Sequence, residues 1–424
     1  MKFGTDGLRG RATPDADGGV AITPELAMSL GNALVAVLGP RIAVARDTRP
    51  SGPMLVAATV AGICAAGGEA VDLGVLPTPG LSAVVPRLGL SGGVVVTASH
   101  NPVDDNGLKA VDATGAKLEG AARKAVEARL GGPLARGVPG PVRALDAGEL
   151  SVEAVLDALP RGKWLAGRTI VLDTANGAAT GLAGRVLGAL GARVIAIADG
   201  DGVINHACGA LHPERCVAAV RDHGADAGIA LDGDGDRGHV VLPDGAVLDG
   251  DAMIWLCAGD APEAWGGTPI VGTVMTNGGL EAALGARGQR LVRTPVGDAY
   301  VAAAVKEHGA AVGGEPSGHV LFADGLPTAD GLLTALRALH PDPRGVEARL
   351  SGFVRHAQEN VAVRVSADRI PATEGVVAAL RAAGARVVVR PSGTEPVVRL
   401  MVEHIDADVA RSGLDRLRAA LESA

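Results

Sequence analysis

Short apolar runs alternate with longer Ala-rich stretches along most of the 424-residue chain. Residues 42–45 precede an apolar stretch over 53–66, and residues 169–172 precede another over 181–190. A short run rich in Val and Ile predicts a buried strand, whereas a longer Ala-rich run predicts a helix. Their regular alternation predicts α/β domains with largely parallel sheets.

Three of the predicted strands, at 94–96, 227–231 and 310–314, lead directly into polar loops. Ligands of open α/β sheets bind beyond the carboxyl ends of the strands. We therefore expect three similar α/β domains that face a common central cleft. Turn-rich segments, together with a tail that alternates strand and helix patterns, divide the chain into predicted domains I to IV: 1–145, 146–246, 247–350 and a smaller α+β domain at 351–424.

Composition and charge exclude several classes of function. The formal net charge is -8 and no basic run is present, which argues against a nucleic-acid partner. An anionic substrate would therefore need a local cluster of cations. The four cysteines lack CxxC spacing and indicate reduced thiols. No apolar signal region opens the sequence, and the apolar stretch at 54–68 is too short to span a bilayer, so we expect a soluble cytoplasmic protein without a membrane partner.

The densest chemical motif is the acid loop, residues 232–237, with the sequence DGDGDR. In an extended segment Asp232, Asp234 and Asp236 would point to one side. Three carboxylates so close together repel one another unless a cation lies among them, and oxygen ligands suit Mg²⁺. An EF-hand is disfavoured because Arg237 and Pro243 stand where that motif needs Gly and Glu. A solvated acidic turn is the remaining alternative.

Three other loops and the start of the sequence complete a candidate site. Ser99 lies in TASHNP at the end of a strand, where we expect its hydroxyl to be exposed to the cleft; a helix cap or turn is the alternative. The sequence GEPSGH at 314–319 offers groups that suit sugar hydroxyls, although a plain turn is equally consistent with it. The sequence RPSGTEP at 390–396, followed by Arg399, can form a phosphate-binding nest. The Gly-rich sequence GTDGLRG at 4–10 would have to be fixed in the cleft for Arg9 to act.

With these loops in this order, the chain resembles the α-D-phosphohexomutase family over essentially its whole length. The resemblance implies four domains around a cleft and a phosphorylated Ser99. That serine would pass its phosphoryl group to a sugar monophosphate through a sugar 1,6-bisphosphate, which also serves as activator. It further implies Mg²⁺ held by Ser99, Asp232, Asp234 and Asp236; catalytic roles for Ser99, His100, Lys109, Arg9 and Arg237, with Lys109 as a candidate acid/base; sugar binding by Glu315, Ser317 and His319; and phosphate binding by Arg390, Ser392, Gly393, Thr394 and Arg399.

Substrate preference is indicated by other segments. Residues 3–10, 271–277 and 296–301 most resemble family members that interconvert glucosamine 6-phosphate and glucosamine 1-phosphate. Pro316 departs from the residues usual in the sugar loop, so members that act on mannose or glucose phosphates remain an alternative. A sugar-phosphate phosphatase and a non-catalytic sugar-phosphate binder are further alternatives. The sequence leaves open the general base and the oligomeric state, a homodimer among the options.

Overall fold

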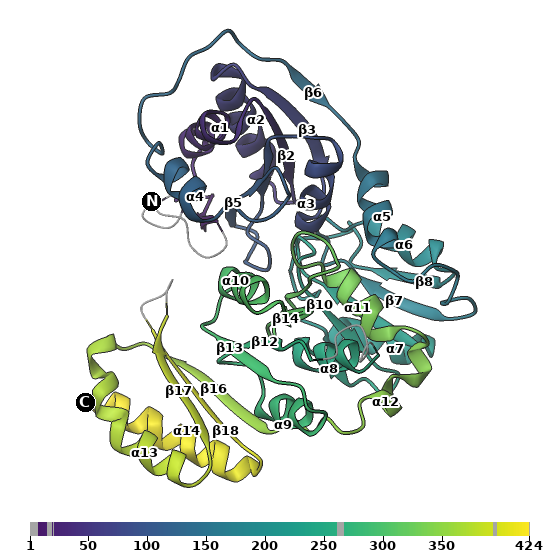
Figure 1. Ribbon diagram of the computed structural model, residues 1–424, viewed down its shortest axis with the longest axis vertical. Coiled ribbons are helices and arrows are strands. Elements are labelled where there is room, and N and C mark those ends of the chain that lie inside the picture. The colour runs from purple at the N-terminus through teal and green to yellow at the C-terminus, as the bar shows by residue number, and fades with distance from the viewer. Residues whose placement is uncertain (1–6, 15–18, 20, 261–266, 393–396, 424) are drawn as a thin grey trace.

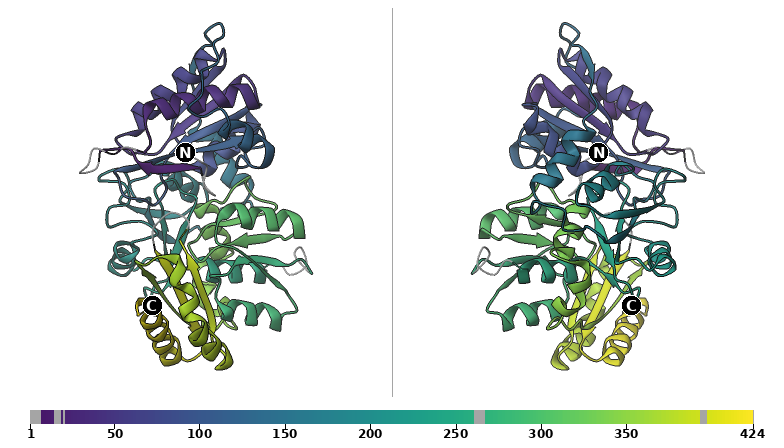
Figure 2. Two further views of the ribbon diagram at one scale, coloured as in Figure 1. Left: turned by 90° about the vertical axis from the view of Figure 1, so that its left-hand side faces the viewer. Right: turned by 90° about the vertical axis from the view of Figure 1, so that its right-hand side faces the viewer.

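Four β-sheets follow one another along the chain in the computed structural model, which describes residues 7–14, 19, 21–260, 267–392 and 397–423 (Figure 1). The first three sheets mix parallel and antiparallel strands, and the last is purely antiparallel. Domain I and the C-terminal domain lie at opposite ends of the molecule, with domains II and III between them (Figures 1 and 2). The predicted α/β architecture with a smaller C-terminal α+β domain is confirmed.

One arrangement of four strands recurs in the first three sheets. In each, a central strand pairs in parallel with a strand on either side, and a fourth strand adds antiparallel to one of these. In domain I these strands are β2 (Arg41–Arg46), β3 (Glu69–Val75), β4 (Gly92–Val96) and β5 (Asp105–Asp112). In domain II they are β7 (Thr169–Asp173), β8 (Arg193–Ile197), β9 (Ala227–Leu231) and β10 (Gly238–Val241). In domain III they are β12 (Ile270–Thr273), β13 (Leu291–Thr294), β14 (Val312–Gly314) and β15 (Val320–Phe322).

The third and fourth strands of each set form a hairpin, and its loop carries the candidate chemistry. The β4–β5 loop holds Ser99, the β9–β10 loop is the acid loop, and the β14–β15 loop holds Glu315 and His319. Three chemically different loops therefore occupy equivalent places in three similar sheets. This equivalence explains why strand–loop patterns about one domain apart could be seen in a sequence with no evident repeats.

Helices connect and cover these strands, and extra strands extend the sheets. Around the first sheet lie α1 (Pro24–Leu38), α2 (Gly52–Ala65), α3 (Thr78–Arg87) and α4 (Gly120–Glu127), with β1 (Leu8–Arg11) and β6 (Val142–Ala144) at its edges. Domain II adds α5 (Gly148–Asp157), α6 (Leu182–Ala189) and α7 (Glu214–His223). Its sheet is extended by β11 (Val247–Leu248), which lies just beyond the predicted boundary at residue 246. Domain III adds α8 (Gly250–Asp260), α9 (Gly278–Ala286), α10 (Asp298–His308), α11 (Gly331–Leu339), a short 3₁₀ turn η1 (Pro343–Gly345) and α12 (Val346–Arg349). No helix in the described part of the chain is long and apolar enough to cross a membrane.

The C-terminal domain is a three-stranded sheet with helices on one face. Its strands are β16 (Ala357–Val363), β17 (Arg386–Pro391) and β18 (Val398–His404), with β18 in the middle. Its helices are η2 (Ala367–Thr373), α13 (Glu374–Ala382) and α14 (Ala407–Glu422). The side chains of Val398, Leu400 and Val402 pack with those of the helices, so the alternate residues of β18 point to the other face.

The apolar cores divide the chain differently from the sheets. Domains II and III share one continuous cluster that joins Leu172 and Val186 to Trp255 and Leu336. Domain I has clusters of its own, and the cluster of the C-terminal domain contains only residues from that domain. The middle of the molecule is therefore a single packed body, to which the C-terminal domain is joined by other means.

Candidate active site

The backbone at Ser99 is held in an unfavourable conformation by groups from two domains. Ser99 has φ 54°, in the left-handed region that non-glycine residues rarely adopt. Its carbonyl oxygen accepts hydrogen bonds from Nη2 of Arg49 at 2.9 Å and from Nδ2 of Asn205 at 2.8 Å. Arg49 is fully buried and pairs with Asp47 at 2.9 Å. Such strain persists only where the surroundings enforce it, as happens at active sites.

The Ser99 hydroxyl points at the acid loop. Its Oγ donates to Oδ2 of Asp232 at 2.7 Å and lies 3.2 Å from Nδ1 of His100. Ser99 has no exposed surface, so the expectation of an exposed hydroxyl is wrong. The sequence pattern places Ser99 correctly at the end of β4, but it cannot show that a loop from domain II covers it.

The acid loop is a turn, which corrects the expectation of an extended segment. The amide of Gly235, at φ 74°, donates to the carbonyl of Asp232 at 3.1 Å. The amide of Asp232 in turn donates to the carbonyl of Arg237 at 3.2 Å. The predicted convergence still occurs, because the three carboxylates each offer an oxygen within 4.8 Å of the others and all three are buried.

Lys109 joins the strand after Ser99 to the acid loop. Its Nζ lies 2.7 Å from Oδ2 of Asp234 and 2.9 Å from Oδ2 of Asp236. Burial and the carboxylates of Asp236 and Asp234 raise the pKa of Asp232 well above its ordinary value. Burial also acts to raise the pKa of Asp236, but Lys109 and His319 outweigh it and hold that pKa well below the ordinary range.

The acid loop fits a divalent cation. Oδ1 of Asp234 and Oδ1 of Asp236 are both buried and accept no hydrogen bond from any described residue. A buried carboxylate oxygen without a donor is costly unless a cation faces it. Hard oxygen ligands of this kind suit Mg²⁺ or Ca²⁺, so the loop can bind a metal ion.

The charges of cationic side chains act on His100, which lies beside the Ser99 hydroxyl. Burial, then the charges of Arg237 and Arg9, lower the pKa of His100 to about 3, so the imidazole is neutral near pH 7. Arg9 lies on β1, which pairs with β5 so that Arg9 is opposite Gly107. The segment 8–11 is thus held beside β5, while residues 4–6 of the same motif lie outside the described residues.

The predicted sugar loop adjoins the acid loop. His319 is buried, with Nδ1 3.7 Å from Oδ1 of Asp236. Glu315 is buried and accepts from the amide of Gly297 at 3.1 Å. Oγ of Ser317 is buried and has no hydrogen-bond partner among the described residues. Ser99, His100, Lys109, the acid loop and His319 therefore form one cluster built from three domains.

Arg390 and Arg399, the described arginines of the predicted phosphate site, lie on the C-terminal sheet and apart from this cluster. Arg390 and Arg399 are directly opposite each other on β17 and β18. Burial, then the charge of Arg399, lower the pKa of Arg390, whereas Glu315 acts to raise it. Two guanidinium groups placed opposite each other repel, which makes the pair receptive to an anion. Ser392 follows β17, and Gly393 and Thr394 lie outside the described residues.

Several residues of this site escaped the sequence interpretation. Asp47 and Arg49 follow β2, so they too lie beyond a strand end, and that position was the available signal. Asn205 comes from an irregular segment and carried no signal. Lys117 forms an ion pair with Asp298 and so links domain I to domain III near the sugar loop.

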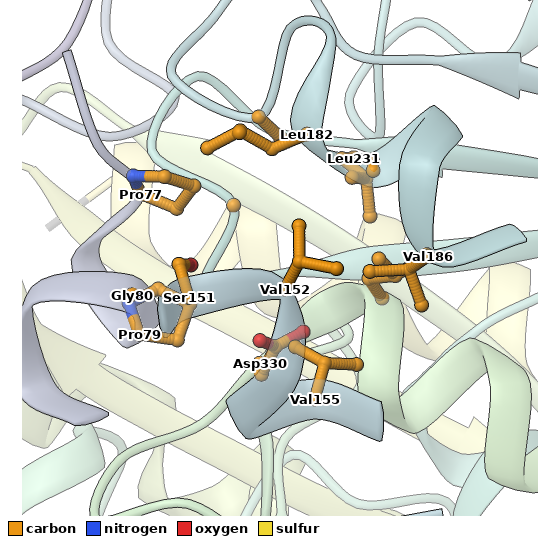
Figure 3. Close-up of a pocket in the computed structure, with 14 residues that line it drawn as sticks. Pro77, Pro79, Gly80, Ser151, Val152, Val155, Leu182, Val186, Leu231 and Asp330 are labelled. Atoms are coloured by element: carbon orange, nitrogen blue, oxygen red, sulfur yellow. The ribbon is translucent and has the colours of Figure 1, made fainter. Parts of the chain in front are cut away.

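A small cavity lies behind the acid loop where three domains meet (Figure 3). It has a volume of about 30 Å³, which is room for about one water molecule. Gly235 forms part of its wall, together with mostly apolar side chains and the carboxyl of Asp330. Burial raises the pKa of Asp330 to about 6. Because the cavity is so small, we interpret it as part of the packing that supports the acid loop and not as a ligand site.

Comparison with known proteins gives one consistent result. Sequence profiles of the phosphoglucomutase/phosphomannomutase family match residues 1–132 with alpha/beta/alpha domain I, 152–245 with domain II, 249–341 with domain III and 353–420 with the C-terminal domain. A phosphoglucosamine mutase of Frankia alni is 42% identical, covering 100% of this chain and 98% of the relative. Further bacterial relatives with the same name are 40–41% identical.

Solved structures agree in fold. A phosphoglucomutase/phosphomannomutase family protein from Burkholderia thailandensis has a TM-score of 0.77 at 28% identity, covering 99% of this chain and 97% of that chain. An N-acetylphosphoglucosamine mutase of Aspergillus fumigatus, determined with GlcNAc-6P and magnesium, has a TM-score of 0.67 at 18% identity, covering 100% and 96%. Sequence, fold and site geometry together show that this chain belongs to the phosphoglucomutase/phosphomannomutase family of α-D-phosphohexomutases and is an intramolecular phosphotransferase.

Proposed function

We propose that this chain interconverts glucosamine 6-phosphate and glucosamine 1-phosphate through a phosphorylated Ser99. The observation that carries the mechanism is the position of Ser99 Oγ, 2.7 Å from Asp232 and 3.2 Å from His100. The substrate is inferred from the full-length relatives named phosphoglucosamine mutase. The matching profiles describe the family as a whole, so glucose and mannose phosphates are alternative substrates. They are weaker alternatives, because the full-length relatives reported above are named phosphoglucosamine mutase.

The reaction consists of two phosphoryl transfers at one serine. A free hydroxyl of the sugar monophosphate attacks the phosphorus of phosphoserine 99 and gives its proton to a base. The bond from phosphorus to Ser99 Oγ breaks, and Oγ takes up a proton from an acid to become a hydroxyl again. The product is a sugar 1,6-bisphosphate, which turns around in the cleft. Ser99 Oγ then attacks the other phosphoryl group and gives its own proton to a base. The bond from that phosphorus to the sugar oxygen breaks, the sugar oxygen takes up a proton, and the isomeric monophosphate is released.

The residues around Ser99 have distinct proposed roles. Asp232, Asp234 and Asp236, with an oxygen of the phosphoserine, would hold Mg²⁺, which neutralises charge on the transferring group. Lys109 and His100 are the candidates for proton transfer. Arg9 and Arg237 supply positive charge where charge develops in the transition state.

The other loops bind the rest of the substrate. Glu315, Ser317 and His319 would contact the sugar, with Glu315 available to the ammonium group at carbon two. Arg390 and Arg399, with Ser392, Gly393 and Thr394, would hold the phosphate that is not being transferred. A sugar 1,6-bisphosphate is the expected activator, because it restores phosphoserine when an intermediate escapes.

Pro316 limits how selective the site can be. Proline has no N–H to donate, and its carbonyl already accepts from the amide of Gly250 at 3.1 Å. Selectivity is strong only when the wrong substrate leaves polar groups of the site unpaired. We therefore expect a preference for glucosamine phosphate together with measurable activity on glucose phosphate.

The test combines a phosphoryl-transfer assay with a substrate comparison. Purified protein is incubated with glucosamine 1,6-bisphosphate and Mg²⁺, and its intact mass is measured. The wild type and the Ser412→Ala control, altered on the surface helix α14, should gain one phosphoryl group, whereas Ser99→Ala should gain none and should lose nearly all turnover. Full mutase activity in Ser99→Ala would overturn the mechanism. A higher kcat/KM for glucose or mannose phosphate than for glucosamine phosphate would overturn the substrate assignment alone.

A further inference from the structure

The face of the C-terminal sheet that is turned away from its helices is organised in rows of side chains. Strand register places three residues directly opposite one another in each row. The anchor row is Gln358, Glu403 and Arg386, the middle row is Asn360, Met401 and Val388, and the arginine row is Ala362, Arg399 and Arg390. Arg390 lies four positions after Arg386 along β17, which is about 13 Å at the usual rise of a strand.

The anchor row contacts one loop of domain III, residues 273–278. Nη2 of Arg386 donates to the carbonyl of Thr276 at 2.8 Å, and its Nη1 donates to the carbonyl of Val274. Oε1 of Glu403 accepts from the amide of Gly278 at 2.9 Å. Nε2 of Gln358 donates to the carbonyl of Met275 at 2.9 Å. All three side chains of the row therefore bind backbone groups of the same loop.

Arg386 and Glu403 also bind each other. Nη2 of Arg386 lies 2.6 Å from Oε2 of Glu403, and its Nε donates to Oε1 at 3.1 Å. Glu403 is only 2% exposed. A buried, forked pair of this kind has one favourable geometry, so it fixes direction as well as proximity.

The loop that receives this row is itself held firmly by domain III. Nη1 of Arg293 donates to the carbonyls of Thr276 at 2.7 Å and Thr273 at 3.0 Å. Oγ1 of Thr276 accepts from the amide of Thr273 at 2.9 Å. Gly272 has no room for a side chain, because a Cβ there would lie 2.5 Å from Oγ1 of Thr276. The segment 271–277, which the sequence singled out and which the reaction itself does not use, is thus a preformed docking loop.

We propose that Arg386 and Glu403 are positioning residues for the substrate: they seat the C-terminal sheet on the 273–278 loop and thereby set the place of Arg390 and Arg399 relative to Ser99. This inference rests on the proposed role of the arginine row in binding the phosphate that is not transferred. The apolar cluster of the C-terminal domain contains no described residue of domain III, so this cluster does not fix the relative position. Hydrogen bonds are directional, whereas apolar contact is not.

The middle row explains why the anchor must be rigid. A hollow of about 330 Å³ lies between Met275 and the sheet face, and its walls include Asn360, Arg390 and Arg399. As far as the described residues show, this hollow separates domain III from the sheet between the anchor row and the arginine row. A small tilt at the anchor would therefore be magnified at the guanidinium groups.

The test is a double-mutant cycle between the anchor and the arginine row, read in steady-state kinetics with glucosamine 6-phosphate. Arg386→Ala should raise KM about tenfold with kcat changed less than about twofold, since a group that binds ground and transition states alike affects KM alone. Arg399→Ala should raise KM about ten- to hundredfold. The double variant should have nearly the KM of Arg399→Ala. Arg386 acts only by placing Arg390 and Arg399, and that pair of arginines is already incomplete in Arg399→Ala.

Further variants separate positioning from a loss of folding. Arg386→Lys, which keeps the charge but lacks the fork, should recover part of the KM, and Glu403→Gln should resemble Arg386→Ala. Arg418→Ala, on the surface of α14 in the same domain, should leave KM unchanged. If Arg386→Ala unfolds the domain, Gln358→Ala, which removes a single anchor bond, should still raise KM measurably.

The outcomes separate the two proposals. If Arg399→Ala leaves KM unchanged, the phosphate-binding role fails, and the positioning role fails with it. If Arg399→Ala raises KM but Arg386→Ala and Gln358→Ala do not, the positioning role alone is overturned. Additive effects of Arg386→Ala and Arg399→Ala on KM would also overturn it, because independent sites add.

Discussion

At the scale of single residues, the site depends on groups that never touch the substrate. Ser99 was identified from its place at the end of a strand, and the acid loop from the spacing of its carboxylates. Neither the strand end nor the carboxylate spacing points to Asn205. This residue lies 106 positions from Ser99 in the chain, and its side chain donates a hydrogen bond to the Ser99 carbonyl. Contacts over such separations are set by how the domains pack, and a single sequence does not record that packing.

Asn205→Asp tests the support of the Ser99 backbone. Nδ2 of Asn205 donates hydrogen bonds to the carbonyls of Ser99 and Asn101. Aspartate has the same shape but places a negatively charged oxygen there, which repels both carbonyl oxygens. We expect kcat to fall by about tenfold or more, since each lost hydrogen bond is worth about 0.5–1.5 kcal/mol and repulsion adds to this. Asn32→Asp is the matched control, because Asn32 also donates to two carbonyls but far from Ser99. It should lower stability without lowering kcat; equal kcat in both variants would contradict the role of Asn205.

Asp251, at the start of α8, predicts a dependence of stability on pH. Burial, then the charge of Asp249, raise its pKa from 3.8 to about 7, against the opposing charges of Arg355 and Arg293. The folded protein therefore binds this proton more tightly than the unfolded chain does. The stabilisation is complete below about pH 4 and is lost as the pH rises through 7.

Asp251→Asn should remove this dependence. Denaturant unfolding should be measured at pH 5 and at pH 8. Between these pH values the free energy of unfolding of the wild type should fall by up to about a few kcal/mol more than that of the variant. Asp244→Asn, at an exposed turn, serves as the control and should behave as the wild type. A wild-type protein and Asp251→Asn variant with parallel pH profiles would show that Asp251 ionises normally in the fold.

At the scale of elements, the repeated hairpin decides what each loop can do. The strands β4, β9 and β14 were predicted from their apolar runs, because a buried parallel strand is apolar on both faces. The common strand–loop plan of the three domains was predicted from the same runs, whereas the hairpin that each loop closes was not. Turn geometry also escaped prediction: the acid loop was expected to be extended, but Gly235 makes it a turn.

Gly318→Ala tests the contact between two of these hairpins. Gly318 has φ 85°, and a Cβ there would lie 2.2 Å from the carbonyl oxygen of Gly238, at the start of β10. Gly309 has φ 60°, but nothing lies within 4 Å of a Cβ built there. Gly309→Ala therefore tests the backbone strain of a positive φ without a steric clash. Thermal unfolding should show a cost of about 1–2 kcal/mol for Gly309→Ala and a clearly larger one for Gly318→Ala. In addition, only Gly318→Ala should raise the KM for glucosamine 6-phosphate, and equal effects of the two variants would argue against a packed contact between the loops.

At the scale of the whole molecule, the site exists only where domains meet. The alternation of strand and helix patterns predicted the class of the domains, and turn-rich segments predicted how many there are. The sharing of one apolar cluster by domains II and III was not predictable, because helix patterns show that a face is apolar but not which face covers it. The effect of the Glu315 charge on Arg390, across two domains, was not predictable for the same reason.

Mg²⁺ should therefore stabilise the protein as a whole. A ligand that binds only the folded state adds about 2.7 kcal/mol at a concentration of 100 times its Kd. We expect a higher Tm in saturating Mg²⁺, a return to the starting Tm after chelation, and reversible loss of activity with it. Asp234→Asn should weaken the Tm increase, whereas Asp244→Asn should retain it. An unchanged wild-type Tm in Mg²⁺, with full activity after chelation, would show that the acid loop is not a metal site.

The separate apolar cluster of the C-terminal domain has a consequence for how the protein loses its structure. Domains II and III share an apolar core, so they must unfold together as one cooperative unit. The C-terminal domain has an apolar cluster of its own, so it can unfold separately once its hydrogen bonds to the 273–278 loop break. Calorimetry should then give a broader transition than a single all-or-none step, and one Tm would not describe the molecule. Heating would then inactivate the enzyme by unfolding the C-terminal domain, with Arg390 and Arg399, while Ser99 and the acid loop were still in folded domains.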